Sequence, residues 1–316
     1  MTRIRHLLPF DTPTLTVMGA LVLMLLGFGT IYPQFLSPAY LLGQLHVAAF
    51  LGIVAAGTMM VILIGRIDMS IPWTMTAAAV VATSIGPGQM SGNISILAGL
   101  AVGAAVGLVN GFGVAILRVP AIIWTLAVDT ILRGAIVYYS AQTLINSTPA
   151  PLIRAVGQQQ VAGVPLAVVV WVVLSLAVIL VLARSVAGRQ IHAVGTSETA
   201  AFLSGIPTRR VIFGAFVFSG LCNALAGMMV AGYANQAYLD MGAGYLLPAI
   251  AAVVIGGTSI LGGRGRYSGT IGGVLLITLA SSLLSIVRAP ESLRQIVFGL
   301  LILAMVAVYS RSRQAG

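Results

Sequence analysis

Apolar runs about as long as a membrane-spanning helix recur throughout this 316-residue chain, and short polar segments separate them. A helix needs roughly 20 apolar residues to cross the hydrocarbon core of a bilayer. Only 7% of the residues are charged, whereas an average soluble domain has about 25%, so a soluble surface of this size could not be covered. The sequence therefore predicts an all-α polytopic membrane protein that forms one transmembrane domain over residues 1–316.

The lengths of these runs predict about ten transmembrane helices. Two of the runs, Ile71–Gly86 and Pro248–Gly262, are short enough to be broken or re-entrant helices that line a cavity. The ten expected spans are Thr14–Tyr32, Leu42–Gly65, Ile71–Gly86, Asn93–Leu117, Val119–Ala141, Pro165–Ala183, Val211–Tyr233, Pro248–Gly262, Ser268–Val287 and Leu293–Ser310.

The basic residues, all of them arginine, predict how the chain is oriented. With the N-terminus inside and ten crossings, twelve of the 16 fall on the cytoplasmic side and one, Arg133, lies within a span. The three on the outer side are Arg154, Arg288 and Arg294. Because cytoplasmic loops carry an excess of positive charge, we expect both termini and the polar segment 184–210 in the cytoplasm, and the polar segment 142–164 outside.

The residues that would support catalysis or bind a cofactor are missing from the sequence. Without any lysine the chain cannot contain a P-loop nucleotide site of its own. The three histidines lie on separate segments without metal-ligand spacing, and no G-x-S-x-G elbow occurs. We expect no catalytic residue, metal or cofactor in this chain. The net charge of +10 is explained by membrane orientation and does not require a nucleic-acid partner.

The segment 184–210 contains the most informative local pattern. Ser197 can cap a helix, Glu198 suits the positive first turn, and Gly205 and Pro207 end it. The predicted two-turn helix would present Ala200, Ala201, Phe202 and Leu203. A helix with exposed apolar residues outside the bilayer favours a protein partner, although a connector that lies on the membrane surface is equally compatible.

Two charged residues lie within the fifth expected span. Asp129 and Arg133 are four residues apart and therefore share one face of a helix. A single charge at mid-membrane costs about 2.5–3.5 kcal/mol on insertion scales, so we expect the pair to face the bundle or a wet cavity. Either the two line a translocation pathway, or they form an ion pair that locks two helices; a proton relay through Asp129 is a further alternative.

Four other polar residues are candidates for a pathway or gate. Asp68 and Ser70 precede the short third span, where Ser70 can cap the helix, so they either fix its start at a cytoplasmic gate or only cap it. Asn110 and Asn223 are amides within apolar spans, each of which makes an interhelical hydrogen bond or contacts a substrate.

Two further patterns concern packing and the outer face. Gly99, Gly103, Gly107 and Gly111 repeat every four residues, which predicts a close helix-packing seam within the chain or between two chains. Gln236, Tyr238 and Asp240 face outward in the expected topology, where a substrate would enter or a soluble partner would dock, unless they only form a solvated loop.

Several segments match motifs of one known family. Glu198–Ile206 is similar to a Glu-Ala-Ala-x-x-x-Gly coupling loop, with Thr199 in place of the first alanine. The other matching stretches are Gly65–Ser70, Leu117–Pro120, Ile131–Gly134, Ala249–Ser259 and Gly262–Gly265. Together they resemble permeases of ABC importers, specifically the ribose/xylose-type sugar branch. The family usually has glycine at the position of Arg66 and often acidic residues at Leu246–Pro248; these departures bear on the substrate more than on the fold.

The resemblance implies a type II ABC importer permease with two pseudo-symmetric halves, which translocates a sugar across the bacterial inner membrane by alternating access. The implied partners are a second permease subunit, identical or related, ATP-binding subunits that hold Mg-ATP, and a periplasmic sugar-binding protein. The residues implied to contact the ATPase are Ser197, Glu198, Thr199, Ala200, Ala201, Phe202, Leu203 and Gly205. The alternatives are a branched-chain amino acid permease and an ion-coupled secondary transporter that uses Asp129.

Overall fold

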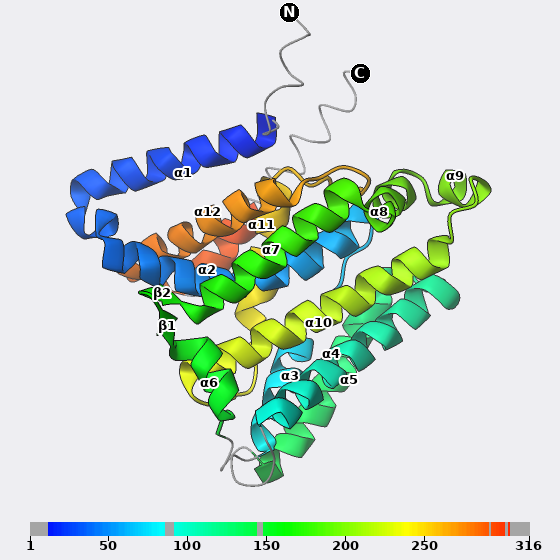
Figure 1. Cartoon of the computed structure of the whole chain (residues 1–316), viewed down its shortest axis with the longest axis horizontal. Helices are drawn as coiled ribbons and strands as arrows, with labels where there is room; N and C mark the ends of the chain where they lie inside the picture. Colours follow the sequence, from blue (N-terminus) through cyan, green and yellow to red (C-terminus); the bar gives the residue numbers. More distant parts are fainter. Residues whose placement is uncertain (1–11, 86–91, 144–147, 291, 301–302, 304–316) are drawn as a thin grey trace, which may run out of the picture.

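Helices form nearly all of the regular structure in the computed structural model, which describes residues 12–85, 92–143, 148–290, 292–300 and 303 (Figure 1). The α-helices are α1 (Thr12–Ile31), α2 (Pro38–Leu63), α3 (Ile71–Ser84), α4 (Gly92–Gly111), α5 (Ala121–Thr143), α6 (Pro151–Gln158), α7 (Leu166–Arg184), α8 (Val186–Thr196), α9 (Glu198–Leu203), α10 (Thr208–Ala234), α11 (Leu246–Ile255) and α12 (Tyr267–Ile286). Short 3₁₀ turns η1 (Pro33–Leu36) and η4 (Ala243–Tyr245) and a π-helical turn η2 (Phe112–Ile116) join them. The all-α expectation is confirmed.

The helices agree closely with the expected spans. Among the residues that the structure describes, six helices are long and apolar enough to cross a membrane, namely α2, α4 with η2, α5, α7, α10 and α12. Helices α1 and α3 cover two more of the expected spans, and α11 covers the first part of a third. The tenth, Leu293–Ser310, begins in the helical residues 292–300, and the rest of it lies outside the described residues apart from residue 303.

The predicted end of the Pro248–Gly262 span was wrong. Helix α11 ends at Ile255, and the chain then forms a glycine-rich turn. Gly257, Gly262 and Gly263 have φ angles of 90°, 86° and 76°, in the left-handed region that an α-helix of L-residues excludes. The apolar run continues beyond the helix because this turn is packed against other elements: Gly263 N donates to Leu63 O over 2.8 Å.

The two polar segments contain structure that the sequence did not reveal. In segment 142–164, α6 is followed by a hairpin of β1 (Gln160–Val161) and β2 (Val164–Pro165), with Gln160 opposite Pro165. In segment 184–210, α8 precedes the expected short helix. Helix α6 packs closely on α10, because Gly157 lies directly against the backbone of Gly232.

The packing supports two halves of similar design. Helices α2, α3 and α4 form one series of long, short and long helices, and α10, α11 and α12 form another. The two long helices α2 and α10 pack against each other, α10 packs against α3 and α4, and α2 packs against α11 and α12 (Figure 1). Each long helix thus packs against the short and the following helix of the other half, as expected for pseudo-symmetric repeats.

The short helix α3 begins inside the bundle. Ser70 and Ile71, at its start, are buried, and Asp68 just before it bonds to Ser219, the twelfth residue of α10. At 1.5 Å per residue, Ser219 lies about 16 Å from the start of α10. The segment between α10 and α11 also reaches α3, since Gly242 N donates to Thr76 Oγ1 over 3.3 Å. Helix α3 is therefore a broken helix of the kind found at transporter midplanes.

The four spaced glycines of α4 lie against α10. A Cβ atom at Gly103 would collide with the carbonyl oxygen of Gly220, and one at Gly107 would lie 2.6 Å from Val217 Cα. Gly99 faces Met228 and Gly111 faces Phe213 in the same way. The seam is therefore an intramolecular one, in which missing side chains let two long helices approach closely.

Candidate functional site

Helix α9 has the local structure that its sequence predicts. Ser197 Oγ accepts a hydrogen bond from Ala200 N over 3.2 Å, and Gly205 follows the helix with a φ of 81°. Phe202 and Leu203 are 67% and 80% exposed, but Ala201 is only 4% exposed. The expectation that Ala201 is presented outward was wrong, because one side of so short a helix must rest on the protein that holds it.

Two arginines from other segments hold Glu198, the first residue of α9. Arg66 Nη2 donates to Glu198 Oε2 over 2.8 Å, and Arg118 Nη1 bonds to Oε1. Arg66 follows α2, whereas Arg118 lies between η2 and α5 with a φ of 60°. Neither pairing could be predicted from the sequence, since 132 and 80 residues separate these arginines from Glu198. The contact fixes α9 to both segments.

A cavity of about 820 Å³ opens beside α9. It is lined by Arg118, Glu198, Thr199, Phe202, Pro207, Thr208, Arg209 and Arg210. Exposed apolar residues stand next to a concave, mainly basic wall in this region. Such a combination is typical of a protein-docking surface, where an apolar anchor is surrounded by polar groups.

A buried hydrogen-bond network surrounds Asp68. Its Oδ1 accepts from Ser70 N (2.9 Å) and Ser70 Oγ (2.7 Å), and its Oδ2 accepts from Ser219 Oγ (3.0 Å). Asn110 Nδ2 donates to Ser70 Oγ over 2.7 Å, and Asn223 Nδ2 to Ser219 Oγ over 3.4 Å. All four of the expected pathway residues outside α5 thus meet in one cluster, together with Ser219, a residue that sequence reasoning missed.

The amides behave differently from each other. The hydrogen bond of Asn110 links α4 to the start of α3, as expected for an amide that joins two helices. The hydrogen bond of Asn223 stays within α10. Both side chains are buried, and their Oδ1 atoms find no hydrogen-bond partner in the described part of the chain. Neither lines the cavity beside α9.

The start of α3 is capped from another helix. Ser70 occupies the N-cap position, but its hydroxyl makes no capping bond and binds Asp68 instead, so the capping expectation was wrong. Asp129 Oδ1 of α5 accepts from Trp73 N over 3.2 Å, and Thr125 Oγ1 accepts from Met69 N over 2.9 Å. A carboxylate suits this place because the first N–H groups of a helix lack internal partners.

Asp129 and Arg133 meet the same residue rather than each other. No salt bridge joins them among the described residues. Arg133 Cζ lies 5.9 Å from the ring centre of Trp73, within reach of a cation–π interaction, while Asp129 binds the backbone of Trp73. The expected ion pair is therefore replaced by two contacts that hold α3 against α5.

Gln236, Tyr238 and Asp240 lie in the segment that joins α10 to α11, and all three are exposed. Helix α10 runs from Thr208, close to α9, to Ala234, just before this segment, so the two exposed regions lie at opposite ends of that helix (Figure 1). In the parts of the chain that the structure describes, no group of His, Cys, Asp and Glu could hold a metal ion.

Comparison with known proteins identifies the family. A family model described as "branched-chain amino acid transport system / permease component" matches residues 40–306. The chain belongs to this family. It is 33% identical to the ribose import permease protein RbsC of Escherichia coli strain K12, over 93% of this chain and 92% of that protein. No solved structure matches the chain.

Other relatives in this family are also named as import permeases. The fructose import permease protein FrcC of Rhizobium meliloti is 32% identical over 98% of this chain and 88% of its own length. The autoinducer 2 import system permease protein LsrC of an Enterobacter species (strain 638) is 33% identical over 94% of this chain and 88% of its own length. The resemblance to importer permeases is confirmed, and the chain is a multi-pass transport subunit rather than an enzyme.

Proposed function

We propose that this permease carries a sugar, a pentose, hexose or related polyol, across the bacterial inner membrane in an ATP-driven importer. The relatives named for ribose and fructose import support a sugar over a branched-chain amino acid, which the family description alone would also allow. Mg-ATP would bind to partner subunits, since the sequence contains no lysine for a P-loop. A periplasmic binding protein would deliver the sugar near Gln236, Tyr238 and Asp240.

The main support for this proposal is the way in which α9 is held. Arg66 and Arg118 bind Glu198 at its start. Phe202 and Leu203 at its other end stay exposed. If a partner that binds these exposed residues changes conformation, it can displace α9 and, with it, the segments that hold α9. The α9 end of the bundle would face the cytoplasm, because Arg66, Arg118 and the arginines of 184–210 lie on the loops at that end.

The link from α9 to the interior is short. Arg66 and Asp68 lie on one extended segment, so a shift of α9 would move both the ion pair and the buried network at the start of α3. Alternating access needs two discrete packings that a partner can bias. We place the movable element at segment 64–70 and α3, between the two halves.

The test is the association of this subunit with its ATP-binding subunit. The double variant Phe202→Ser, Leu203→Ser should lose co-purification with the ATPase and ATP-driven uptake in proteoliposomes. Val161→Ser is the matched control, because Val161 is an exposed apolar residue (57%) on the hairpin at the opposite end. Retained ATPase binding in the double variant would contradict the proposed role of α9.

The cargo is tested separately, by measuring which ligand the cognate binding protein binds. Binding of leucine instead of a sugar would overturn the proposed substrate class.

A further inference from the structure

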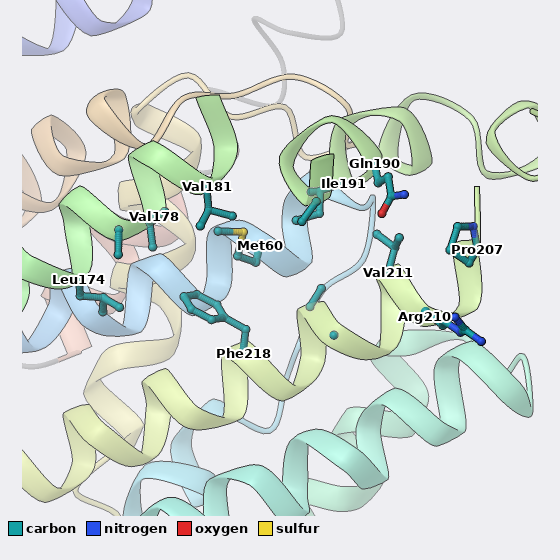
Figure 2. Close-up of a pocket in the computed structure, with 14 residues that line it drawn as sticks. Met60, Leu174, Val178, Val181, Gln190, Ile191, Pro207, Arg210, Val211 and Phe218 are labelled. Atoms are coloured by element: carbon teal, nitrogen blue, oxygen red, sulfur yellow. The ribbon is translucent and has the colours of Figure 1, made fainter. Parts of the chain in front are cut away.

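A second cavity lies apart from the network around Asp68. Its volume is about 460 Å³, within the range of roughly 300–1,000 Å³ that is usual for ligand pockets. Met60 of α2, Val178 of α7 and Phe218 of α10 form much of its apolar wall, and α8 closes one side (Figure 2). It shares only Pro207 and Arg210 with the cavity beside α9.

The lining of this cavity is polar at one end only. Figure 2 shows Arg210 and Gln190 toward the end near Pro207, while Leu174 lies at the far end. All the other lining residues are apolar or glycine. Arg210 takes part in no salt bridge within the described ranges. The cavity is thus apolar over most of its lining and has the cationic residue Arg210 at one end, which matches an amphipathic molecule with an anionic head.

The position of the cavity points to the bilayer as the source of that molecule. The neighbouring face of α7 exposes Val173, Leu176 and Leu180 at 62%, 56% and 52%, as a lipid-facing helix does. Arg210 lies near the start of α10, at the end of the bundle that carries α9. Basic pockets between transmembrane helices on the cytoplasmic side bind anionic headgroups.

We propose that this cavity binds an anionic phospholipid of the cytoplasmic leaflet. Its phosphate contacts Arg210 and Gln190, and one acyl chain lies against Met60, Val178 and Phe218. A protein segment is a poorer occupant, because its backbone groups would need hydrogen-bond partners that only Gln190 and Arg210 could offer here. Since Arg210 also lines the cavity beside α9, a bound headgroup would lie next to the surface where the ATPase is proposed to dock.

A larger residue at Gly214 would test the cavity by occupying part of it. Gly214 lines the wall on α10, and a Cβ atom added there would meet no other atom within 4 Å. The Cβ of Gly214→Leu therefore meets no neighbour, and the rest of the leucine side chain would take up space beside the cavity. Gly19 of α1 is the matched control, because it is also exposed within a helix, has no atom within 4 Å of an added Cβ, and lies on a helix that packs against α12.

The experiment is native mass spectrometry of the purified full chain with phosphatidylglycerol or phosphatidylcholine. The wild type and Gly19→Leu should retain phosphatidylglycerol preferentially. Arg210→Gln should lose about fivefold of that preference, which is the expected contribution of one basic side chain near a membrane surface. Gly214→Leu should lose binding of both lipids at this site, and thermal unfolding in detergent would show that each variant is folded.

Equal phosphatidylglycerol binding by folded Gly214→Leu and Gly19→Leu would overturn the proposal, as would an unchanged lipid preference in Arg210→Gln. A change in oligomeric state of Gly214→Leu without a change in lipid binding would also overturn it, and would assign the cavity to a contact between two copies. If Gly214→Leu does not fold, Arg210→Gln still decides. The measurement is independent of transport, so the proposed function can fail while this inference holds.

Discussion

Arg66 donates from Nη2 to Glu198 Oε2 over 2.8 Å and thereby joins the segment between α2 and α3 to helix α9. Two residues later on the same segment, Asp68 binds Ser219 of α10 in the interior. One extended stretch of chain therefore connects the exposed helix to the buried start of α3.

Arg66→Gln should impair coupling without unfolding the protein. A partly exposed salt bridge contributes only about 0–1 kcal/mol to stability, so the unfolding temperature should change little. ATP-driven uptake should fall by at least about fivefold, the lower end of usual coupling energies. Arg189→Gln on α8 is the control, since Arg189 is exposed and outside the Glu198 ion pairs. Equal uptake by the two variants would argue against transmission through Arg66.

Asp68→Ala should destabilise the folded protein. The substitution removes the acceptor of three hydrogen bonds, from Ser70 N, Ser70 Oγ and Ser219 Oγ. Hydrogen bonds in membrane proteins contribute about 0.6 kcal/mol on average, so the expected loss is about 2 kcal/mol, measurable by unfolding in detergent. Thr130→Ala, which removes an exposed bond within α5, should have little effect. An equal effect of both would mean that the Asp68 network adds no stability.

Gly103→Ala should weaken the contact between α4 and α10. An added Cβ would collide with Gly220 O, and overpacking of this kind costs about 1–3 kcal/mol. Gly43→Ala on α2 should be neutral or stabilising by up to about 1 kcal/mol, because its Cβ would meet no neighbour and alanine favours a helix. Thermal unfolding of the two purified variants distinguishes these outcomes. Loss of stability in Gly43→Ala alone would contradict the seam.

Asp129→Asn separates structural capping from proton coupling. The amide oxygen can still accept from Trp73 N, so ATP-driven uptake should stay close to that of the wild type and should not respond to a protonophore. Asp129→Ala removes the acceptor and should lower uptake, since the start of α3 loses its cap. If Asp129→Asn abolishes uptake and a protonophore stops the wild type, the protein is an ion-coupled transporter instead.

The sequence was sufficient for the long apolar helices and for the local structure of α9. Long apolar runs leave few alternatives to helices in a bilayer, because every backbone group must be satisfied internally. The Ser197 cap and the Gly205 terminus depend on neighbours within four residues, so they too could be predicted. Helix α8 was missed because Gly188 and Gly195 lower the helical signal of its eleven residues.

Only the tertiary structure decided which polar groups meet. Glu198 pairs with Arg66 and Arg118, Asp68 with Ser219, and Asp129 with the backbone of Trp73, across separations of 56 to 151 residues. Residue spacing suggested instead that Asp129 pairs with Arg133 and that Ser70 caps α3. Spacing along a helix reports only which side chains share a face, whereas the partner opposite that face depends on how the two halves pack. That packing depends on the glycine seam between α4 and α10. It also depends on the way in which α2 packs against α11 and α12, and α10 against α3 and α4.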